Sequence, residues 1–295
     1  MAMGDSAEQQ PWTVLRLLNW TKDYFTRAGL DSPRLSAEVL LGHVLACKRI
    51  ELYARYEYLP TADELAAFRA LVKRAGEHEP IAYLIGRKEF YSLDFIVTPD
   101  VLIPRPETEI VVDQALGHIK SLGRDACLWD VCTGCGCIAV AVAANAPQAS
   151  VLATDLSAAA VAVAARNATA HKVSDRVTTL TADLLALPPE WNGPRTFDVI
   201  TANPPYVTDS AELSAAVQRE PAMALYGGAE GLDLIERLVA AAPGALASGG
   251  MLAMEIGYDQ RDAVTAIISD VGAFGEPRFI TDLQNHPRVA VALRK

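Results

Sequence analysis

The sequence predicts an α/β protein in which a small helical bundle precedes a mostly parallel sheet. Two observations carry this prediction. Apolar residues recur at helical spacing over residues 12–80, and short apolar runs alternate with helical segments from residue 109 onward. Repeated β–α units favour a parallel sheet with helices on both faces. With 295 residues, of which 51% are apolar, the chain is long enough for two domains.

The first domain, residues 1–88, is predicted to be helical. Ser32, followed by a first-turn proline, precedes one apolar face at helical spacing, and the capping box Thr61–Glu64 precedes another. Residues 12–25 show the same spacing. We expect the bundle to end near Pro80. We expect the polar N-terminal segment before it, Met1 to Gln10, to be disordered.

A connector of hairpin-like pattern is predicted over residues 89–108. It contains the aromatic pair Phe90–Tyr91, the alternating run Phe95–Val97, the turn residues Thr98–Asp100 and the apolar run Val101–Ile103. Short apolar runs around turn residues are typical of antiparallel strands.

The remainder, residues 109–295, is predicted to be the α/β domain. We expect helices over residues 110–122, 138–145, 158–171, 232–247 and 260–271, and strands over residues 127–131, 151–154, 177–180, 197–201 and 251–256, near residue 279 and over residues 289–293. In such sheets ligands bind beyond the carboxyl ends of the strands. The functional motifs of this sequence fall at those ends.

A glycine turn, residues 132–136, follows the first of these strands and starts a helix. Glycine lets the backbone approach a ligand, and the amides of a helix N-terminus attract an anionic group. Asp155 ends the next strand, where a carboxylate accepts hydrogen bonds from both hydroxyls of a ribose. Asp183 and Leu184 end a third strand, where an acid often meets an adenine amino group and its neighbour packs on the ring; a solvated loop acid explains Asp183 equally well.

Two cofactors fit this arrangement, a dinucleotide and S-adenosylmethionine. A dinucleotide fingerprint needs G-x-G-x-x-G, and its third position here is Ala139, the weaker variant. Asp130, just before the turn, would lie near a pyrophosphate. That acid suits a methionine ammonium instead, directly or through water, so S-adenosylmethionine is favoured.

The segment Asn203-Pro204-Pro205-Tyr206 follows another predicted strand directly. Proline fixes φ and removes backbone donors, so this loop presents acceptors, namely the Asn203 side-chain oxygen and the Pro204 carbonyl. An amide or aromatic amine nitrogen is a poor nucleophile. Hydrogen bonds from its N–H groups to such acceptors become stronger as the nitrogen becomes positive in the transition state. Tyr206 is expected to stack on the flat substrate group, so the loop predicts methylation of a planar nitrogen.

Composition and charge limit the partners. The net charge of −10 argues against a broad basic surface for nucleic acid, and residues 1–80 hold ten Lys and Arg against eleven Asp and Glu. The sequence contains no apolar stretch of spanning length and no signal-peptide pattern. We expect a cytoplasmic monomer with no membrane partner and no direct nucleic-acid partner.

Three cysteines, Cys132, Cys135 and Cys137, fall within six residues and superficially suggest a metal or redox site. They lie inside the glycine turn, without a second cluster, and the histidines are scattered. We expect no metal and interpret these cysteines as small buried apolar residues.

Four segments resemble the HemK/PrmC family, the glutamine N5-methyltransferases of peptide-chain release factors. They are Glu79–Gly86, Glu89–Tyr91, Leu102–Glu109 and Asn203–Tyr206. The resemblance extends from about residue 12 to the C-terminus and also includes Ser32–Leu35, Glu220–Pro221 with Leu225, Gly231–Asp233 and Glu255–Gly257. It implies a helical domain that recognises the release factor and a seven-stranded, Rossmann-like class I methyltransferase domain. The implied substrate is the glutamine of a Gly-Gly-Gln loop, and S-adenosylmethionine becomes S-adenosylhomocysteine.

The resemblance also implies roles for individual residues. The implied cofactor contacts are Cys132, Thr133, Gly134, Cys135, Gly136, Asp155, Asp183, Leu184, Asn203 and Arg105. The implied contacts to the glutamine amide are Asn203, Pro204, Pro205 and Tyr206, with Asn203, Pro204 and Tyr206 as the catalytic group. An alternative for Arg105 is an ion pair with Glu107 or Glu109 at a domain hinge.

The glycine turn departs from the family, which usually has Gly where Cys132 stands and Ser or Thr where Cys135 stands. A positive φ at Cys132 would strain the backbone. Alternative functions are methylation of a ribosomal-protein glutamine, whose family lacks the Pro-Glu-Thr-Glu continuation at residues 106–109, methylation of adenine N6 in DNA or RNA, and cofactor binding without catalysis.

Overall fold

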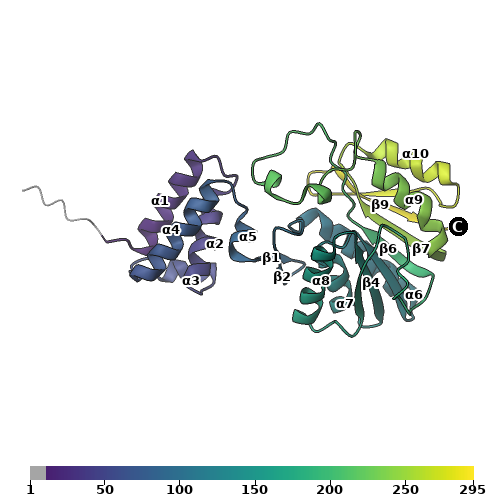
Figure 1. Cartoon of the computed structure of the whole chain (residues 1–295), viewed down its shortest axis with the longest axis horizontal. Coiled ribbons are helices and arrows are strands. Elements are labelled where there is room, and N and C mark those ends of the chain that lie inside the picture. Colours follow the sequence, from purple (N-terminus) through teal and green to yellow (C-terminus); the bar gives the residue numbers. More distant parts are fainter. Residues whose placement is uncertain (1–10) are drawn as a thin grey trace, which may run out of the picture. The chain divides into compact units, whose positions relative to one another are not determined.

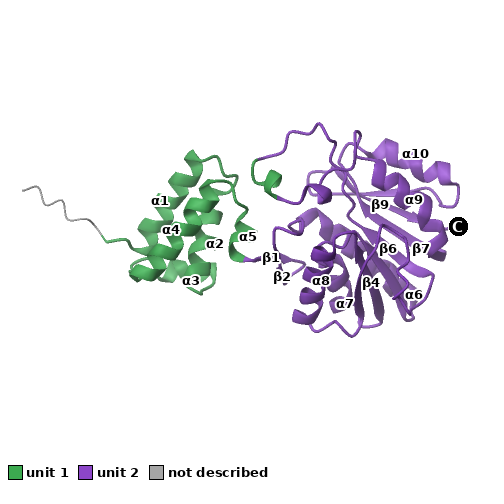
Figure 2. Ribbon diagram, in the orientation of Figure 1, with its two compact units in different colours: residues 1–85, 215–219 green, residues 86–214, 220–295 purple. Residues whose placement is uncertain are grey.

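A computed structural model describes residues 11–295, so the lead-in predicted for residues 1–10 lies outside the described part. The chain divides into two compact units (Figure 2). The first comprises residues 1–85 with 215–219, and the second comprises residues 86–214 with 220–295.

The first unit is helical, as predicted. Its helices are α1 (Val14–Arg27), α2 (Pro33–Val44), α3 (Arg49–Ala54), α4 (Ala62–Gly76) and α5 (Ile81–Ile85) (Figure 1). Apolar side chains from these helices form one core, in which Leu18, Phe25, Leu40 and Phe68 are buried. The sequence pattern missed α3 and α5 because helices of six and five residues are too short to show a period.

One of the two predicted helix caps is confirmed. Thr61 accepts a hydrogen bond from the Glu64 amide, and the Glu64 carboxylate accepts one from the Thr61 amide, which completes a capping box. Ser32 stands at the N-cap of α2, but its side chain makes no capping hydrogen bond, with φ −131° and ψ 66°. The prediction that the Ser32 side chain caps this helix is therefore wrong, although the helix does begin at the following proline.

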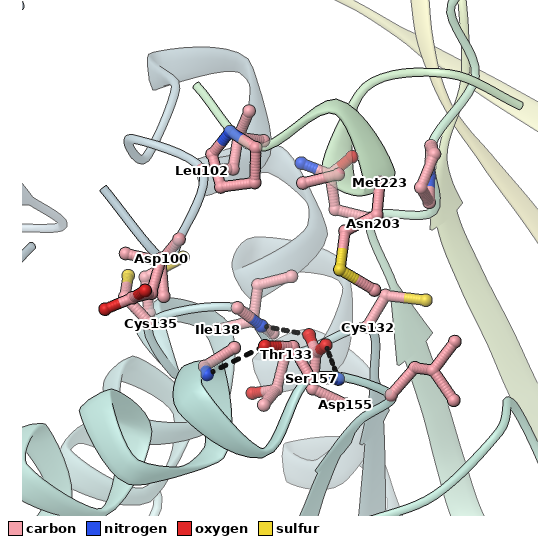
Figure 3. Close-up of a pocket in the computed structure, with 18 of the residues that line it drawn as sticks. Asp100, Leu102, Cys132, Thr133, Cys135, Ile138, Asp155, Ser157, Asn203 and Met223 are labelled. Atoms are coloured by element: carbon pink, nitrogen blue, oxygen red, sulfur yellow. Dashed lines mark hydrogen bonds between the residues drawn. The ribbon is translucent and has the colours of Figure 1, made fainter. Parts of the chain in front are cut away.

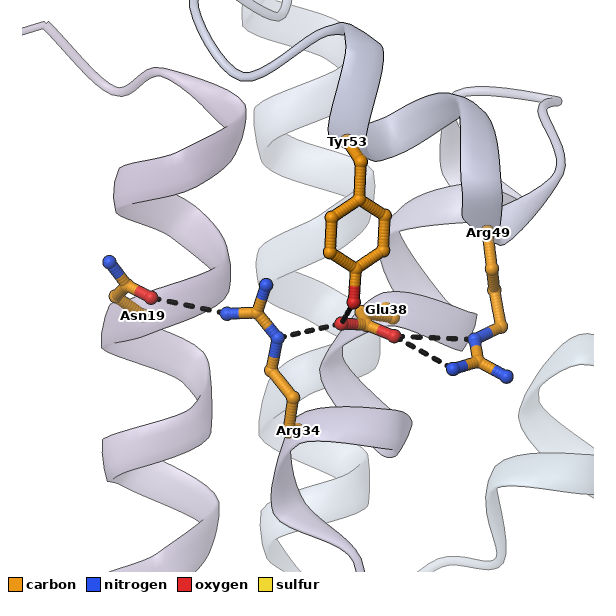
Figure 4. A network of polar contacts seen from close by, with 5 residues as sticks. All are labelled: Asn19, Arg34, Glu38, Arg49 and Tyr53. Atoms are coloured by element: carbon orange, nitrogen blue, oxygen red, sulfur yellow. Dashed lines mark hydrogen bonds and ion pairs between the residues drawn. The ribbon is translucent and has the colours of Figure 1, made fainter.

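A buried carboxylate ties three helices of this unit together (Figure 4). Glu38 of α2 is 1% exposed and accepts hydrogen bonds from Arg34 Nε (2.6 Å), Arg49 Nη2 (2.9 Å) and the Tyr53 hydroxyl (2.6 Å). Burial opposes ionisation of Glu38, but the hydrogen bonds from Tyr53 and Arg34 outweigh it and lower the pKa of its carboxyl group. The network links α1, through Asn19 bound to Arg34, with α2 and α3.

The second unit begins with a two-stranded antiparallel hairpin, β1 (Arg87–Phe90) and β2 (Leu93–Ile96). Its turn is Tyr91–Ser92, with φ of 52° and 59°, and both positive values are those of a type I′ turn. Thr98–Asp100 form a turn as predicted, in which the Val101 amide donates to the Thr98 carbonyl, but this turn follows the hairpin and does not join its strands. Val101–Ile103 form no strand. Tyr91–Ser92 lacks the Asn or Gly that normally marks such a turn, so no local pattern predicts a turn at these residues.

A seven-stranded sheet forms the centre of the second unit. Its strands are β3 (Ala126–Val131), β4 (Ala149–Asp155), β5 (Val177–Thr181), β6 (Phe197–Ala202), β7 (Leu246–Glu255), β8 (Arg278–Thr281) and β9 (Pro287–Leu293). The strand order is β5-β4-β3-β6-β7-β9-β8, in which β9 alone runs antiparallel to its neighbours. The predicted α/β class with a mostly parallel sheet is confirmed, and strands β3 and β6 are buried throughout.

Five helices of the second unit pack on this sheet, and Figure 1 labels them around it. They are α6 (Glu109–Leu122), α7 (Cys137–Asn145), α8 (Ala158–Ala170), α9 (Asp233–Ala245) and α10 (Arg261–Val271). Helices α6, α7 and α8 contact one another in sequence, and α9 contacts α10. Chain crossovers run outward from β3 in one direction and from β6 in the other, so right-handed connections place the two groups on opposite faces. The boundary between β3 and β6 is therefore the topological switch point, where ligands bind in such folds.

Candidate active site

A pocket lies at the carboxyl ends of β3, β4, β5 and β6 (Figure 3). Its empty space is about 940 Å³, with the open solvent at its mouth included. Its lining comes from residues 100–108, 132–138, 155–160, 182–184, 203–205, 221–224 and 234, not every one of which contacts the space. Segments far apart in the sequence thus meet at the switch point.

The glycine turn forms one wall of the pocket. Gly134 has φ 54°, and a Cβ there would point into open space, so the missing side chain leaves room along the backbone. Gly136 has a different task. A Cβ on it would come within 3.0 Å of the Ala164 Cβ, so this glycine lets α7 start close against α8.

Cys132 adopts the strained conformation that the departure from the family implied. Its φ is 56°, in the left-handed region where a side chain costs free energy that glycine avoids. The side chain is partly buried against the core of the second unit and also lines the pocket. Burial raises the pKa of the Cys132 thiol well above its usual range, so at neutral pH the residue is a neutral wall of the pocket.

Asp155 stands at the end of β4 and is aimed at the glycine turn (Figure 3). Its Oδ2 accepts a hydrogen bond from the Gly134 amide and its Oδ1 accepts one from the Ser157 amide, each at 2.9 Å. Each carboxylate oxygen keeps a second lone pair. Burial raises the pKa of Asp155, and the backbone hydrogen bonds from Ser157 and Gly134 work against that shift.

Asp130, which we expected to meet a ligand ammonium directly or through water, is fully buried beneath the turn. Its carboxylate accepts hydrogen bonds from the hydroxyls of Thr133 (2.6 Å) and Thr201 (2.8 Å). It is 0% exposed and is not part of the pocket lining. Burial raises the pKa of Asp130 to about 7, although both threonine hydrogen bonds oppose the shift. The expectation of direct contact is corrected: Asp130 braces the turn from below.

Asp183 and Leu184 both line the pocket at the end of β5. The Asp183 side chain is half exposed and forms an ion pair of 2.7 Å with Arg237 of α9. Leu184 is buried and has φ 47°, which turns its side chain toward the core and the pocket wall. This position is compatible with both roles considered for Asp183, an acid exposed to solvent in a loop and an acid that meets a ligand.

Asn203 follows β6 and lines the pocket opposite Asp155 (Figure 3). Its Nδ2 donates a hydrogen bond of 3.1 Å to the Thr108 hydroxyl. Thr108 donates in turn to Glu255 Oε2 at 2.5 Å, and the Tyr206 hydroxyl donates to Glu255 Oε1 at 2.9 Å. Because its nitrogen is bound to Thr108, the Asn203 amide presents its oxygen on the other side.

Arg105 is held by a partner that the sequence did not suggest. Its Nη2 lies 2.6 Å from Glu220 Oε1, and the other Glu220 oxygen accepts a hydrogen bond from the Ile103 amide at 2.9 Å. The alternative pairing with Glu107 or Glu109 is therefore wrong. Glu220 is buried and joins the connector to residues 221–224, which form part of the pocket wall.

The structure brings most of the predicted site residues to one pocket. Those that line it are Cys132, Thr133, Gly134, Cys135, Asp155, Asp183, Leu184, Asn203 and Pro205. In the described part of the chain, Arg105, Gly136, Pro204 and Tyr206 are not among the lining residues. The Tyr206 ring packs partly buried against the core, and its hydroxyl is bound to Glu255.

Sequence reasoning missed three residues that support the site, namely Thr108, Glu220 and Glu255. Thr108 and Glu255 are each 1% exposed, and burial of polar side chains is not visible in a sequence. The only signal was position, because each lies in or beside a segment that carried the family resemblance. Within residues 11–295, no group of three or more His, Cys, Asp or Glu side chains is placed to hold a metal ion.

Comparisons with known proteins agree with this architecture. Residues 16–86 match the PrmC N-terminal domain and residues 115–225 match the methyltransferase small domain. The catalytic domain of hMettl16 superposes with a TM-score of 0.52 at 14% identity, over 70% of this chain and 76% of that one, which supports the fold alone. The seven-stranded sheet and its switch-point pocket thus define a Rossmann-like class I methyltransferase.

The relatives identify the family more narrowly. A release factor glutamine methyltransferase of Rhodopirellula baltica is 41% identical over 294 residues, which cover 97% of this chain and 98% of the relative. One from Geobacter sulfurreducens is 40% identical, with 88% and 90% covered. A solved release-factor-specific protein-(glutamine-N5) methyltransferase of Alicyclobacillus acidocaldarius is 29% identical, with 68% and 99% covered and a TM-score of 0.41. This chain belongs to the release factor glutamine methyltransferase family.

Proposed function

We propose that this protein transfers a methyl group from S-adenosylmethionine to the side-chain amide nitrogen, N5, of the glutamine in the Gly-Gly-Gln loop of class 1 peptide-chain release factors. The observation that carries the proposal is the fixed Asn203 amide at the edge of the switch-point pocket. Its oxygen is an acceptor for the N–H groups of a planar substrate amide. Membership of the family supplies the substrate class.

The pocket fits S-adenosylmethionine by its donor and acceptor set. The open backbone at Gly134 and the carboxylate of Asp155 suit a ribose, and Asp183 with Leu184 suits an adenine ring. The bound cofactor supplies an electrophilic methyl group on a positively charged sulfur. We propose that Cys132, Thr133 and Cys135 complete the cofactor wall, as the resemblance implies, with Gly136 and Arg105 acting through the loop and the connector.

The chain's own residues would bind, orient and stabilise the amide. Asn203 and the Pro204 carbonyl accept hydrogen bonds from its N–H groups, so the nitrogen is held in line with the methyl group. As the nitrogen bonded to the methyl carbon, the electron pair of the broken C–S bond would stay on sulfur and the nitrogen would become positive, so these hydrogen bonds would strengthen. The nitrogen would then lose one proton to solvent. Pro205 and Tyr206 would shape the space for the flat amide, with Tyr206 held by Glu255.

The domains would divide the work. We propose that residues 1–88 recognise the release factor, residues 89–108 connect, and residues 109–295 bind the cofactor and catalyse transfer. In residues 11–295, no helix is both long enough and apolar enough to cross a membrane. Since release factors act in translation, we propose that the enzyme works in the cytoplasm, as a monomer.

One assay distinguishes release-factor methylation from methylation of a ribosomal protein or of nucleic acid. Labelled S-adenosylmethionine is incubated with the enzyme and either a class 1 release factor, the same factor with its Gly-Gly-Gln glutamine changed to alanine, a ribosomal-protein substrate, or DNA and RNA. We expect label only on the unaltered release factor. Label on nucleic acid or on the ribosomal protein, and none on the release factor, would contradict the proposal.

The same assay tests the role of Asn203. Asn203→Ala removes the acceptor but leaves Asp155 and the glycine turn in place. We expect turnover to fall by about 100-fold or more, the scale seen when one preorganised hydrogen-bonding group is removed, while cofactor affinity changes less. Retained turnover would show that the acceptor argument is wrong.

A further inference from the structure

Asn203 and three polar side chains behind it are linked by a continuous series of hydrogen bonds, and the middle two, Thr108 and Glu255, are buried. Asn203 donates to Thr108 (3.1 Å), Thr108 donates to Glu255 (2.5 Å), and Tyr206 donates to the other oxygen of Glu255 (2.9 Å). Thr108 and Glu255 are each 1% exposed, so water does not compete for these hydrogen bonds. The four residues come from the connector, from the loop after β6 and from the end of β7.

The direction of each hydrogen bond follows from the number of protons available. An ionised carboxylate only accepts, and each hydroxyl has a single proton. Glu255 therefore accepts one hydrogen bond from the Thr108 hydroxyl and one from the Tyr206 hydroxyl. The Thr108 oxygen then has only lone pairs to offer Asn203, so it binds the amide nitrogen of Asn203 and not its oxygen.

This direction decides what Asn203 offers to a substrate. With its nitrogen on Thr108, the amide turns its oxygen to the opposite side as an acceptor. The reversed amide would present two N–H donors, which repel the N–H groups of a glutamine amide. A side chain of Asn is nearly symmetric in shape, so sterics alone leave both orientations accessible.

We propose that Glu255 is a positioning residue that, through the Thr108 hydroxyl, fixes the Asn203 side chain with its oxygen toward the substrate nitrogen. The inference rests on the proposed function, because it assigns a direction to the acceptor of that reaction. Tyr206 is the second donor on the same carboxylate and keeps Glu255 oriented. No contact between Glu255 and the substrate is needed.

The charges around Glu255 bear on its ionisation. Burial raises the pKa of its carboxyl group, whereas the hydrogen bonds from Thr108 and Tyr206 lower it. Glu107 adds a repulsive negative charge and Arg288 an attractive positive one. The hydrogen bonds from the Thr108 and Tyr206 hydroxyls favour the ionised carboxylate, but they do not cancel the effect of burial, so the pKa of Glu255 is raised overall.

The Thr108 hydroxyl provides a matched pair of variants. Thr108→Val keeps the shape and removes the hydroxyl, while Thr108→Ser keeps the hydroxyl and removes a buried methyl group. If Thr108 only packs, the serine variant is the more damaged of the two. If Thr108 relays orientation, the valine variant is the more damaged. Glu255→Gln is the third variant, because its amide nitrogen can donate to Thr108 and release the threonine proton toward Asn203.

Three measurements on the full-length variants decide between these readings. They are kcat and KM with the release factor, the affinity for S-adenosylhomocysteine by calorimetry, and the side-chain NH₂ signals of Asn203 in a nitrogen-15 NMR spectrum. The Asn203 signals are assigned by their disappearance in Asn203→Asp. The last two measurements do not require turnover.

We expect Thr108→Val and Glu255→Gln to lower kcat about tenfold or more, with KM changed less, because the acceptor acts most strongly in the transition state. Thr108→Ser should stay within about threefold of the unaltered enzyme, and affinity for S-adenosylhomocysteine should stay within about threefold in all three. The Asn203 NH₂ signals should shift in the valine and glutamine variants and remain in place in the serine variant.

Equal kcat in the valine and serine variants, or a larger loss in the serine variant, would overturn the inference. So would unshifted Asn203 signals in Thr108→Val. If Glu255→Gln does not fold, the Thr108 pair still decides. If the unaltered enzyme labels no release factor, the proposed function fails, and the NMR comparison alone then supports or overturns the orientation of Asn203.

Discussion

Asp155 combines two tasks at the end of β4. Its two oxygens hold the Gly134 and Ser157 amides, so it shapes the glycine turn, and its remaining lone pairs face the pocket. A carboxylate is suited to both tasks because it is acceptor-only. An amide at this position has one acceptor oxygen and would set an NH₂ group against a backbone N–H.

We therefore expect Asp155→Asn to weaken binding of S-adenosylmethionine at least about tenfold, or about 1.4 kcal/mol, as measured by calorimetry. Asp175→Asn is the control, since the Asp175 side chain is 74% exposed on the surface. Cofactor affinity in the control should match the unaltered protein. Unchanged affinity in Asp155→Asn would remove Asp155 from the cofactor site.

Cys132 illustrates a residue that the turn tolerates at a cost. With φ 56°, it occupies a conformation for which glycine is better suited, and its partly buried side chain packs against the core. The sequence identified this position as a departure from the family, and the structure shows the positive φ that makes it one. The neutral thiol, raised in pKa by burial, leaves it a packing role and no acid–base role.

At the scale of elements, helix starts were predicted better than helix caps. Thr61 and Ser32 look alike in the sequence, each a hydroxyl residue before an apolar helix, yet only Thr61 makes the capping hydrogen bond. Their backbones differ: Thr61 is extended at φ −62° and ψ 166°, whereas Ser32 has ψ 66°. The tertiary path of the chain before α2 decides this angle.

The difference predicts unequal effects on stability. Thr61→Ala should lower the free energy of unfolding of the helical unit by about 1 kcal/mol, the usual cost of losing an N-cap. Ser32→Ala should change it by less than about 0.5 kcal/mol, since no capping hydrogen bond is lost. Denaturant unfolding followed by circular dichroism compares the two, and equal losses would refute the distinction.

The long strands and helices of the second unit were largely predictable, and a hairpin was predicted within residues 89–108, but the turn that joins its strands was not. Strands β3 and β6 are mostly apolar and buried throughout, and α8 has a serine N-cap that accepts a hydrogen bond from the Ala160 amide. These signals are local. The Tyr91–Ser92 turn has no local signal, because its type I′ geometry is maintained by distant groups: Glu109 accepts from the Tyr91 amide and Asp113 accepts from the Tyr91 hydroxyl.

At the scale of the whole molecule, Asp130 links the stability of the second unit to pH. It lies in the central strand β3, and it binds Thr133 in the turn and Thr201 in the neighbouring strand β6. Burial raises its pKa to about 7, whereas an unfolded aspartate has a pKa of about 3.9. Between these values the folded protein holds a proton that the unfolded chain releases. Asp130 therefore reduces stability as the pH rises from about 4 to about 7.

Asp130→Asn tests this linkage, because an asparagine resembles the neutral acid at every pH. We expect the stability of the variant, relative to the unaltered protein, to increase between pH 5 and pH 8, as measured by urea unfolding midpoints. Other titrating groups cancel in this difference. A difference that stays constant with pH for Asp130→Asn would exclude the raised pKa.

The sequence by itself determined the division into a helical and an α/β part, the order of strands and helices along the chain, and the segments that hold the candidate functional residues. These follow from local patterns, namely apolar periodicity, glycine and proline positions, and the residues at strand ends. Only the tertiary structure decided which of these residues meet. Asn203 and Thr108 are 95 positions apart and Thr108 and Glu255 are 147 apart, while Arg105 pairs with Glu220 across 115 positions.

The physical reason is that the direction of a hydrogen bond depends on partners brought together by folding. Asp130 looked like a ligand-binding acid in the sequence, and packing placed it below the turn with two threonines. The sequence indicated that Asn203 is a hydrogen-bond acceptor. Its oxygen is free to accept because its amide nitrogen donates to the buried Thr108 hydroxyl. Residue type sets what a side chain is able to do, and its buried neighbours select which of those things it does.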